Sequence, residues 1–563
     1  MANLIEKAKQ QIKEIIENAA AKAQADNTLP EGEMQKFVVE VPSDTTHGDF
    51  ASNVAMANAK TFRSAPRKIA EAIVANFNFE NTYFEKAEIA GPGFINFFLK
   101  DSWFSDVIKN ACDEGADYGK SDYGKNEKVM VEFVSANPTG PMHMGNARGG
   151  AIGDVLAEAM KWAGYQVQRE FYINDAGNQI AKFGISLEAR YLQLYKGDEI
   201  EFPEDGYHGE DIKERAQAFA DIHGDKYVNA SEEERRKALV DYALPLNIAK
   251  LKTDLSAYRI EFDEWFPEST LHASGAVLAV VDLMKEKGYA YEKDGAIWYE
   301  ATKLGAEKDE VLVRANGFPT YFAADIAYHY NKFVVRGFNK CIDVWGADHH
   351  GHVARLKGAL NCTGVNGDNL DIVLMQLVNL IQDGQPVRMS KRSGKAIQLA
   401  DLIEEIPIDA ARFFFTMREA NSTLDFDLDL AVEESSKNPV YYVQYAHARI
   451  CSILNNIKAE GINIDNISEV NASLLTTAEE KELIRIIAAM PNEIISVAKS
   501  YDTAALPHYV MDVATAFHKF YGACKVRTED EALMNARIAL CNAARNVIKN
   551  VLTMLKVSAP EKM

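Results

Sequence analysis

The sequence is poor in cysteine, with six among 563 residues and none of them in a Cys-x-x-Cys pair. Scattered single cysteines argue against a disulfide framework and against a cysteine-based zinc site. No uninterrupted apolar run approaches the ~18 residues of a membrane span. Charges recur every few positions in residues 1–24, which predicts an amphipathic helix rather than a signal peptide. We therefore expect a cytoplasmic protein with reduced thiols and no membrane partner.

The two common phosphate-binding motifs are also absent. The sequence has neither G-x-x-x-x-G-K-[ST] nor a G-x-G-x-x-G that follows a strand-like run. Any nucleotide site in this chain must therefore use another loop geometry.

Acidic side chains outnumber basic ones by 82 to 61, which gives a net charge of −21. Such an excess argues against a nucleic-acid partner for the chain as a whole and is typical of a soluble protein surface. From Ser436 to the C-terminus, however, the two signs are nearly equal in number. Because binding depends on the local surface rather than on the sum, the C-terminal part can still bind a nucleic acid.

The chain is long enough for about three or four domains. A polar segment at 113–128 is typical of a linker after a first unit. The apolar run VMVEFV, a helical pattern from Ile152 to Ala163 and the strand-like QVQREFYI then predict a right-handed βαβ unit. Residues 195–240 are rich in Glu and Asp, which indicates a solvated helical insertion. Long amphipathic periods over the C-terminal ~130 residues are typical of a helix bundle.

A first candidate site lies in Ser135–Gly150, SANPTGPMHMGNARGG. Its prolines keep the residues before them out of the helical region, Gly145 permits close approach, and we expect a helix to begin near Asn146. A helix N-terminus that follows a parallel strand binds phosphate readily. His143 would add a donor and Arg148 a fixed positive charge, although a lone histidine beside a glycine is more often structural.

A second candidate site is the basic loop GQPVRMSKRSGKAIQL at 384–399. A flexible basic loop can close over a polyphosphate and offset the charge of the leaving group. Taken alone, it would be interpreted as a solvated turn. Together with the first segment it favours phosphate chemistry.

The two segments resemble the signatures of class I aminoacyl-tRNA synthetases, which are His-x-Gly-His and Lys-Met-Ser-Lys-Ser. The further segments HGDFASN, YINDAGNQI, YFAADIAYH, WGADHHGH and NPVYYVQYAHARI narrow the resemblance to bacterial arginyl-tRNA synthetases, over nearly the whole chain. Two positions depart from the pattern: Asn146 stands in place of the second histidine, and Arg388 in place of the first lysine. Lys391, the second lysine, is retained.

The resemblance implies a multidomain α/β fold. An N-terminal α+β domain (1–120) would contact tRNA, and a Rossmann-type parallel-sheet catalytic domain (121–400) would carry a helical insertion around 195–300. A C-terminal all-α helix bundle (401–563) would bind the anticodon. The implied function is an arginine–tRNA ligase in protein synthesis, which activates L-arginine with ATP and Mg²⁺ and transfers it to tRNA(Arg). The resemblance also leads us to expect a monomer.

The resemblance also implies site residues. Catalysis is expected from His143, Asn146 and Lys391. ATP is expected to contact Pro138, Thr139, Gly140, His143, Gly145, Asn146, Gly346, Asp348, His349, His352, Met389, Ser390 and Lys391. Arginine is expected to contact Glu132, Ser135, Asn137, Tyr321, Asp325 and His349. Contacts with tRNA are expected from His47, Asp49, Phe50, Asn53, Tyr442, Gln444 and Arg449.

Side-chain physics suits arginine as the substrate. A guanidinium cannot lose its charge and prefers planar carboxylate acceptors. Glu132 carries a charge within an otherwise apolar strand, which is costly unless it is paired. Tyr321 and Asp325 are four residues apart and share one face of a helix. Without the resemblance, Asp325 would be interpreted as a surface residue and Tyr321 as a core residue.

Other interpretations stay open. Three histidines at 349, 350 and 352 suggest zinc, but no further Cys or His cluster completes a site. Another class I synthetase would lack the Glu132 and Asp325 pairing. A non-catalytic tRNA-binding relative would have no reason to keep His143 and Lys391. A small adenylyl-transferase leaves the C-terminal bundle unexplained.

Overall fold

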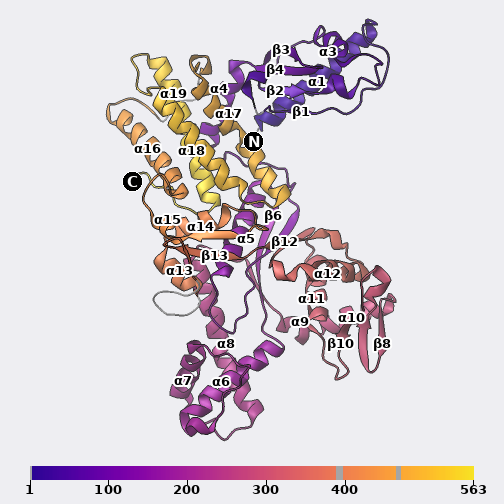
Figure 1. The fold of residues 1–563 in the computed structure, drawn as a ribbon, viewed down its shortest axis with the longest axis vertical. Helices are drawn as coiled ribbons and strands as arrows, with labels where there is room; N and C mark the ends of the chain where they lie inside the picture. The colour runs from indigo at the N-terminus through magenta and orange to yellow at the C-terminus, as the bar shows by residue number, and fades with distance from the viewer. Residues whose placement is uncertain (1–2, 43, 388–396, 465–470) are drawn as a thin grey trace.

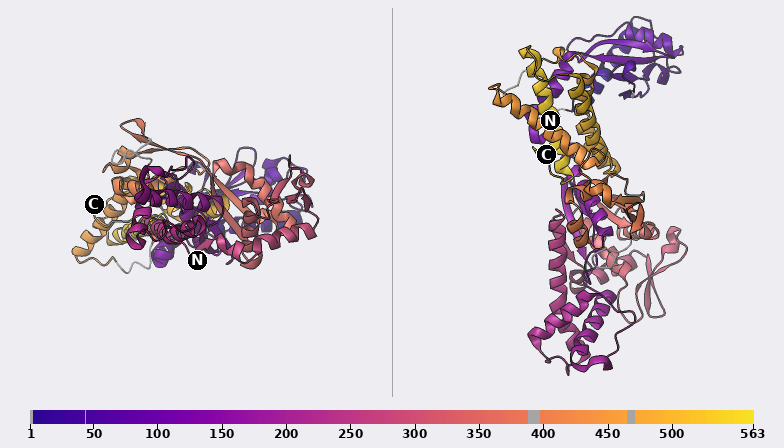
Figure 2. Two further views of the ribbon diagram at one scale, coloured as in Figure 1. Left: turned by 90° about the horizontal axis from the view of Figure 1, so that it is seen from below. Right: turned by 60° about the vertical axis from the view of Figure 1, so that its left-hand side comes forward.

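The structure, a computed structural model, describes residues 3–42, 44–387, 397–464 and 471–563 of an elongated molecule (Figure 1, Figure 2). At one end, α1 (Leu4–Ala25) begins with an Asn3 cap and buries its apolar face against the N-terminal unit. That unit is an antiparallel sheet of order β1-β2-β4-β3. Its elements are β1 (Val39–Glu40), β2 (Phe50–Ser52), α2 (Val54–Ala57), α3 (Pro66–Val74), β3 (Phe84–Ala90) and β4 (Phe94–Leu99).

The catalytic part is built on a five-stranded sheet of order β12-β11-β5-β6-β7, in which every pair of neighbours is parallel. The strands are β5 (Lys128–Glu132), β6 (Gln166–Ile173), β7 (Glu264–Pro267), β11 (Lys340–Gly346) and β12 (Leu370–Met375). The chain moves outward from β5 to β7 and then returns to β11 on the other side of β5. Strand order therefore reverses between β5 and β11, which is where parallel sheets bind ligands.

Helix α5 (Gly145–Trp162) connects β5 to β6 and is buried along almost its whole length. Gly153 permits the close packing, because a Cβ on this residue would lie 2.2 Å from Cγ of Phe133 at the end of β5. Tight packing against the strand fixes the position of the helix N-terminus over the sheet edge.

Two insertions project from the sheet. The first is helical and lies at the far end of the molecule (Figure 1): α6 (Asn178–Lys196), α7 (Glu210–His223) and α8 (Glu232–Ala257). The range 195–300, expected to be helical, also contains β7 of the central sheet and the strands β8 and β9, so only its first part is all helix. The second insertion comprises α9 (Ser269–Ala273), α10 (Ala276–Glu286), β8 (Ala290–Lys293), β9 (Ala296–Tyr299), β10 (Glu310–Val313) and α11 (Tyr321–Tyr330).

The C-terminal part is a helix bundle, as the fold prediction required. It follows α12 (His350–Thr363), a small sheet and short helices: β13 (Val378–Gln382), β14 (Gln385–Val387), α13 (Leu399–Glu405), α14 (Ile408–Thr416), β15 (Leu424–Asp427) and α15 (Leu428–Val432). Its long helices are α16 (Pro439–Ala459), α17 (Ala478–Ser500), α18 (Ala505–Ala523) and α19 (Glu531–Met554). Helix α4 (Asp101–Glu114) contacts α17 and α19 although it precedes residue 120. The domain boundaries remain predictions.

Candidate active site

The backbone at the end of β5 is strained. Val134 and Ser135 have φ values of 68° and 39°, which side-chain-bearing residues rarely adopt. Hydrogen bonds hold the strain in place: Ser135 Oγ donates to Glu132 Oε1 at 2.9 Å and accepts from the Tyr172 backbone N–H at 3.1 Å. This turn directs the following loop across the C-terminal edge of the sheet.

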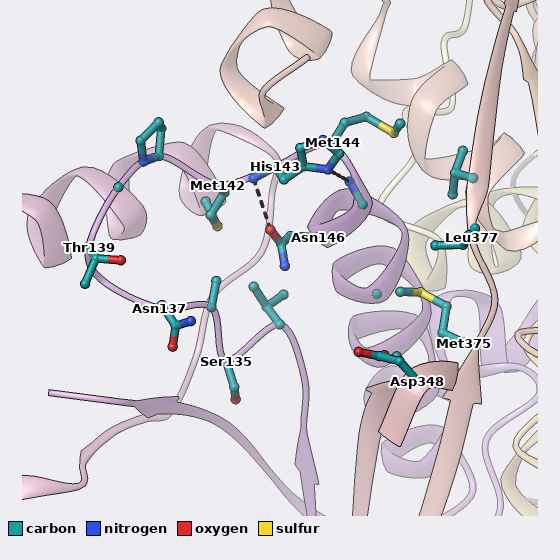
Figure 3. A pocket seen from close by; sticks show the side chains of 18 of the residues that line it. Ser135, Asn137, Thr139, Met142, His143, Met144, Asn146, Asp348, Met375 and Leu377 are labelled. Atoms are coloured by element: carbon teal, nitrogen blue, oxygen red, sulfur yellow. Dashed lines mark hydrogen bonds between the residues drawn. The ribbon is translucent and has the colours of Figure 1, made fainter. Parts of the chain in front are cut away.

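The loop borders a cavity of about 1030 Å³ at the point where strand order reverses (Figure 3). One wall is the loop and the N-terminus of α5, and the opposite wall includes Met375 and Leu377. Gly346 and Asp348 close it at the end of β11. The location and size suit a nucleotide.

His143 and Asn146 are organised by their own backbone. Asn146 Oδ1 accepts from the His143 N–H at 3.1 Å, and His143 Nδ1 accepts from the Gly145 N–H at 3.2 Å (Figure 3). These bonds leave Nδ2 of Asn146 and Nε2 of the exposed His143 for a ligand. Both side chains line the large cavity.

Residues directly after 388–396 pair with the His143 loop. The Met144 N–H donates to the Ile397 carbonyl, and the Leu399 N–H donates to the Met142 carbonyl, both at 3.0 Å. Ile397, the first described residue after 388–396, therefore lies beside the N-terminus of α5. Met389, Ser390 and Lys391 themselves lie outside the described residues.

A second cavity of about 420 Å³ adjoins the first and shares Ser135, Gly346 and His349 with it. Four carboxylates line it: Glu132, Glu268, Asp325 and Asp343. Such a concentration of negative charge requires a cation, either from the protein or from a ligand.

Asp325 lies in this second cavity and is held by two histidines. His352 Nε2 lies 2.5 Å from Oδ2 of Asp325, and His329 Nδ1 lies 3.0 Å from Oδ1. Burial would raise the pKa of Asp325, but the two histidines outweigh it and hold the pKa well below its usual range. The carboxylate is thus ionised at neutral pH. Its side chain remains 25% exposed, toward the cavity.

Three family models match consecutive parts of the chain. They are the arginyl tRNA synthetase N terminal domain over residues 9–99, the class I (R) tRNA synthetase catalytic domain over 108–452, and the DALR anticodon binding domain over 443–563. The catalytic-domain match spans more than half of the chain. The chain belongs to the arginyl-tRNA synthetases.

Relatives agree with this assignment over their full lengths. The arginine–tRNA ligases of Caldanaerobacter subterraneus subsp. tengcongensis and Acetivibrio thermocellus are 56% and 54% identical, each over 100% of both chains. The crystal structure of a putative arginyl-tRNA synthetase from Campylobacter jejuni has 33% identity and a TM-score of 0.75, covering 83% of this chain and 100% of that chain. As an arginyl-tRNA synthetase, the chain uses ATP to attach arginine to tRNA.

Most residues expected to bind ATP line the large cavity of this arginyl-tRNA synthetase: Thr139, Gly140, His143, Gly145, Asn146, Gly346, Asp348 and His349. Pro138 does not line this cavity; it is buried, and its carbonyl accepts from Asn247 of α8 at 3.0 Å. His352 lines the smaller cavity instead. Arg148 is a further correction: it is fully buried and donates to the carbonyls of Gln376 and Glu419, both at 2.9 Å, so it does not face a phosphate.

Five of the residues expected to bind arginine line the smaller cavity: Glu132, Ser135, Tyr321, Asp325 and His349. Asn137 lies in the wall of the larger cavity. Tyr321 is 44% exposed, and its OH accepts from the Asn178 N–H at 2.8 Å. The alternative of a surface Asp325 and a core Tyr321 is therefore wrong. Within the described ranges, no group of three or more His, Cys, Asp or Glu side chains could hold a metal ion.

Several candidate tRNA contacts are structural instead. Phe50 is 2% exposed and packs against Phe84, and Gln444 is 9% exposed and donates to Asp409. Neither side chain is accessible to RNA in this structure, and a role of these two residues in RNA binding stays a prediction. Asp49 is occupied as well, since it accepts from Arg485 of α17 at 2.7 Å.

The remaining tRNA candidates are accessible. His47 is exposed and Asn53 is half-buried, with its Oδ1 accepting from the Val38 N–H. Arg449 is exposed and lies over the Tyr521 ring at 5.0 Å, and Tyr442 is half-buried against His518.

Sequence reasoning missed two groups around the cavities. Tyr207, His208 and Asp211, from the acidic insertion, line the large cavity; the glycines that flank them in DGYHGED were the available signal. Asn174 and Gln179 line the smaller cavity, and the structure gives their buried side-chain oxygens no hydrogen-bond partner among the described residues. Both residues belong to YINDAGNQI, a segment that carries the resemblance, but we had assigned no role to any residue in it.

Proposed function

We propose that the smaller cavity binds arginine between Asp325 and Glu132, and that the larger cavity binds ATP. The observation that carries this proposal is the wall that the two cavities share. Ser135, Gly346 and His349 border both, so the carboxylate of an arginine bound in the smaller cavity can extend into the larger one. Asp325 accepts the guanidinium and Glu132 the α-amino group. Arginine spans the distance between them with its carboxylate toward the α-phosphate of ATP.

The guanidinium has five N–H donors and needs several acceptors. Asp325 is ionised and can accept two of them in a bidentate pair. The unpartnered oxygens of Asn174 and Gln179 supply two more acceptors, and Tyr321 lines the same cavity. Lysine has no planar fork to match this arrangement, so the pocket discriminates by geometry as well as by charge.

Activation requires an in-line attack of the arginine carboxylate on the α-phosphate, with pyrophosphate leaving. The N-terminus of α5, Nε2 of His143 and Nδ2 of Asn146 face the cavity where this charge develops. Lys391 lies outside the described residues, and its place among the phosphate contacts rests on the class I signature alone. Positioning and electrostatics suffice, and no side chain acts as a nucleophile. A 3′-terminal ribose hydroxyl of tRNA then takes the arginyl group and releases AMP.

Mg²⁺ fits this site as a companion of ATP. It binds through phosphate oxygens and one or two carboxylates and keeps several waters. The carboxylates of Asp211 and Asp348 line the large cavity, and Asp348 is 82% exposed there. When bound, the ion neutralises phosphate charge.

For tRNA we propose contacts at both ends of the molecule. On the helix bundle, Arg449 and Tyr442 neighbour the half-buried His518 and the exposed Tyr445, which stack at 24°. Aromatic rings beside a guanidinium suit unstacked anticodon bases. On the N-terminal unit, His47 and Asn53 remain the candidates.

We further propose that the protein acts as a monomer in the cytoplasm; all six cysteines are free thiols, and no described helix is long and apolar enough to cross a membrane.

Pyrophosphate exchange tests the proposal. Each of the twenty amino acids is assayed with and without tRNA. We expect that arginine is the only amino acid to support exchange, and that tRNA increases the rate of this exchange. Exchange with another amino acid would contradict the arginine pocket, and no exchange under any condition would contradict the ATP site.

A further inference from the structure

Three carboxylates stand in a row across the centre of the sheet. Glu132 of β5 is the register partner of both Asp343 of β11 and Glu170 of β6. Glu132 is 6% exposed, and the other two are completely buried. Adjacent buried carboxylates repel strongly unless cations are placed between them.

The chain supplies those cations from one helical face. Lys332 lies in the π-helical turn Asn331–Val335 that continues α11, four residues before Arg336. Lys332 Nζ donates to Glu132 Oε2 at 2.6 Å and to Asp343 Oδ1 at 3.0 Å, while Arg336 pairs with Glu170. Lys332 has no exposed surface. Burial would lower the pKa of Lys332, but Asp343 and Glu132 outweigh it and keep the amine charged.

The same contacts connect the two ends of the arginine pocket. From Glu132 the path runs through Lys332 to Asp343, whose Oδ2 lies 2.8 Å from His329 Nε2. The other ring nitrogen of His329 lies 3.0 Å from Asp325 Oδ1. With a carboxylate at each nitrogen, the ring is protonated. Burial and Lys332 lower the pKa of His329, but Asp325 and Asp343 raise it to about 9.

We propose that Lys332 is a positioning residue which fixes the separation between Glu132 and Asp325, and thereby the side-chain length that the pocket accepts. The inference rests on the proposed function, in which these two carboxylates bind the two ends of arginine. Lys332 does not line the cavity, so it acts through its partners. Without it, Glu132 and Asp343 repel each other, and Glu132 keeps only its contacts with Ser135 and Tyr328, which do not connect it to Asp325.

The test is Lys332→Met, assayed by tRNA-dependent pyrophosphate exchange with three substrates. These are arginine, homoarginine with one more methylene, and 2-amino-4-guanidinobutanoate with one fewer. We expect the KM for arginine to rise at least tenfold and the KM for ATP to change less than twofold. The preference for arginine over the two analogues, as a ratio of kcat/KM values, should fall at least fivefold. An unchanged preference would overturn the proposal, because lost stability alone lowers all three activities together.

Arg235→Met is the matched control. Arg235 is a buried cation of the helical insertion, paired with Glu188 at 2.8 Å and bonded to three carbonyls. Its loss should lower stability and leave the arginine preference as it was. A preference that fell as much in this variant as in Lys332→Met would overturn the proposal.

Tyr328→Phe keeps the inference testable if Lys332→Met does not fold. The single O–H of Tyr328 is shared between Glu132 Oε2 at 2.9 Å and Glu170 Oε1 at 2.5 Å, so phenylalanine removes one anchor of Glu132 without changing the charge. We expect at least a twofold loss of preference, and no loss would overturn the proposal.

Two further variants separate this inference from the proposed function. If Glu132→Gln and Asp325→Asn leave the use of arginine intact, the proposed function fails and takes the inference with it. If both impair arginine while Lys332→Met and Tyr328→Phe keep the preference, only the role of Lys332 is wrong.

Discussion

Asp325→Asn removes the negative charge that we propose to bind the guanidinium of arginine, while it keeps the shape of the side chain. Asp325 is ionised, and its two oxygens can accept two charge-assisted hydrogen bonds from the substrate. Hydrogen bonds to a charged group contribute about 1.5–3 kcal/mol each. Because the amide keeps one acceptor, we expect a loss of about 3–4 kcal/mol, which is on the order of 10²–10³-fold in kcat/KM for arginine.

Pyrophosphate exchange in the presence of tRNA measures this loss. The KM for ATP should change by less than about threefold, since Asp325 does not line the ATP cavity. Asp282→Asn, at an exposed position of α10, is the matched control and should retain full activity. Equal losses for arginine and ATP, or an arginine kcat/KM within about threefold of the parent, would refute the assignment.

Four further predictions follow from the described contacts. His143→Ala should lower the rate of adenylate formation by about 10²-fold with little change in the KM for arginine; a raised arginine KM would argue for a different role. Asn146→Asp keeps the acceptor for the His143 N–H, so thermal stability should hold while the added charge slows activation about tenfold or more in stopped-flow assays; an unchanged rate would place the phosphates elsewhere. The folded-state pKa of His329 is raised to about 9, so its contribution of at most about 3 kcal/mol is complete below pH ~6.5 and is lost as pH rises through 9. The gap in Tm between the parent and His329→Gln should therefore shrink from pH 6.5 to 9.5, and a constant gap would contradict the protonated ring. Arg449→Ala should raise the KM for tRNA about tenfold, and an unaltered KM would remove Arg449 from the RNA surface.

The sequence predicted the fold class because the relevant signals are local. Apolar strand runs, helical periodicity and the βαβ order are all contained within short windows, and the structure has the corresponding parallel sheet and C-terminal helices. The segment Ser135–Gly150 was recognised for the same reason.

The charge network could not be predicted in this way. Glu132 and Asp343 become neighbours only through strand register, across more than two hundred residues of chain. Tyr328, Lys332 and Arg336 recur every four residues, and such a pattern is ordinarily interpreted as one face of a solvated helix. Their burial depends on where α11 packs, which the sequence pattern alone does not specify.

Three side chains that were expected to face phosphate or RNA are buried, for related reasons. Arg148 lies in the first turn of α5 and was expected to face phosphate, but the packing of α5 turns it toward the carbonyls of Gln376 and Glu419. Phe50 and Gln444 belong to segments that resemble RNA-contacting ones, yet individual side chains within such segments also build the core.

A structure with a non-hydrolysable arginyl-adenylate analogue tests the central claim most directly. We predict that the guanidinium forms a bidentate pair with Asp325, the α-amino group lies against Glu132, and the adenosine occupies the cavity beside His143 and Gly346. A guanidinium bound away from Asp325, or an adenosine outside that cavity, would contradict the account.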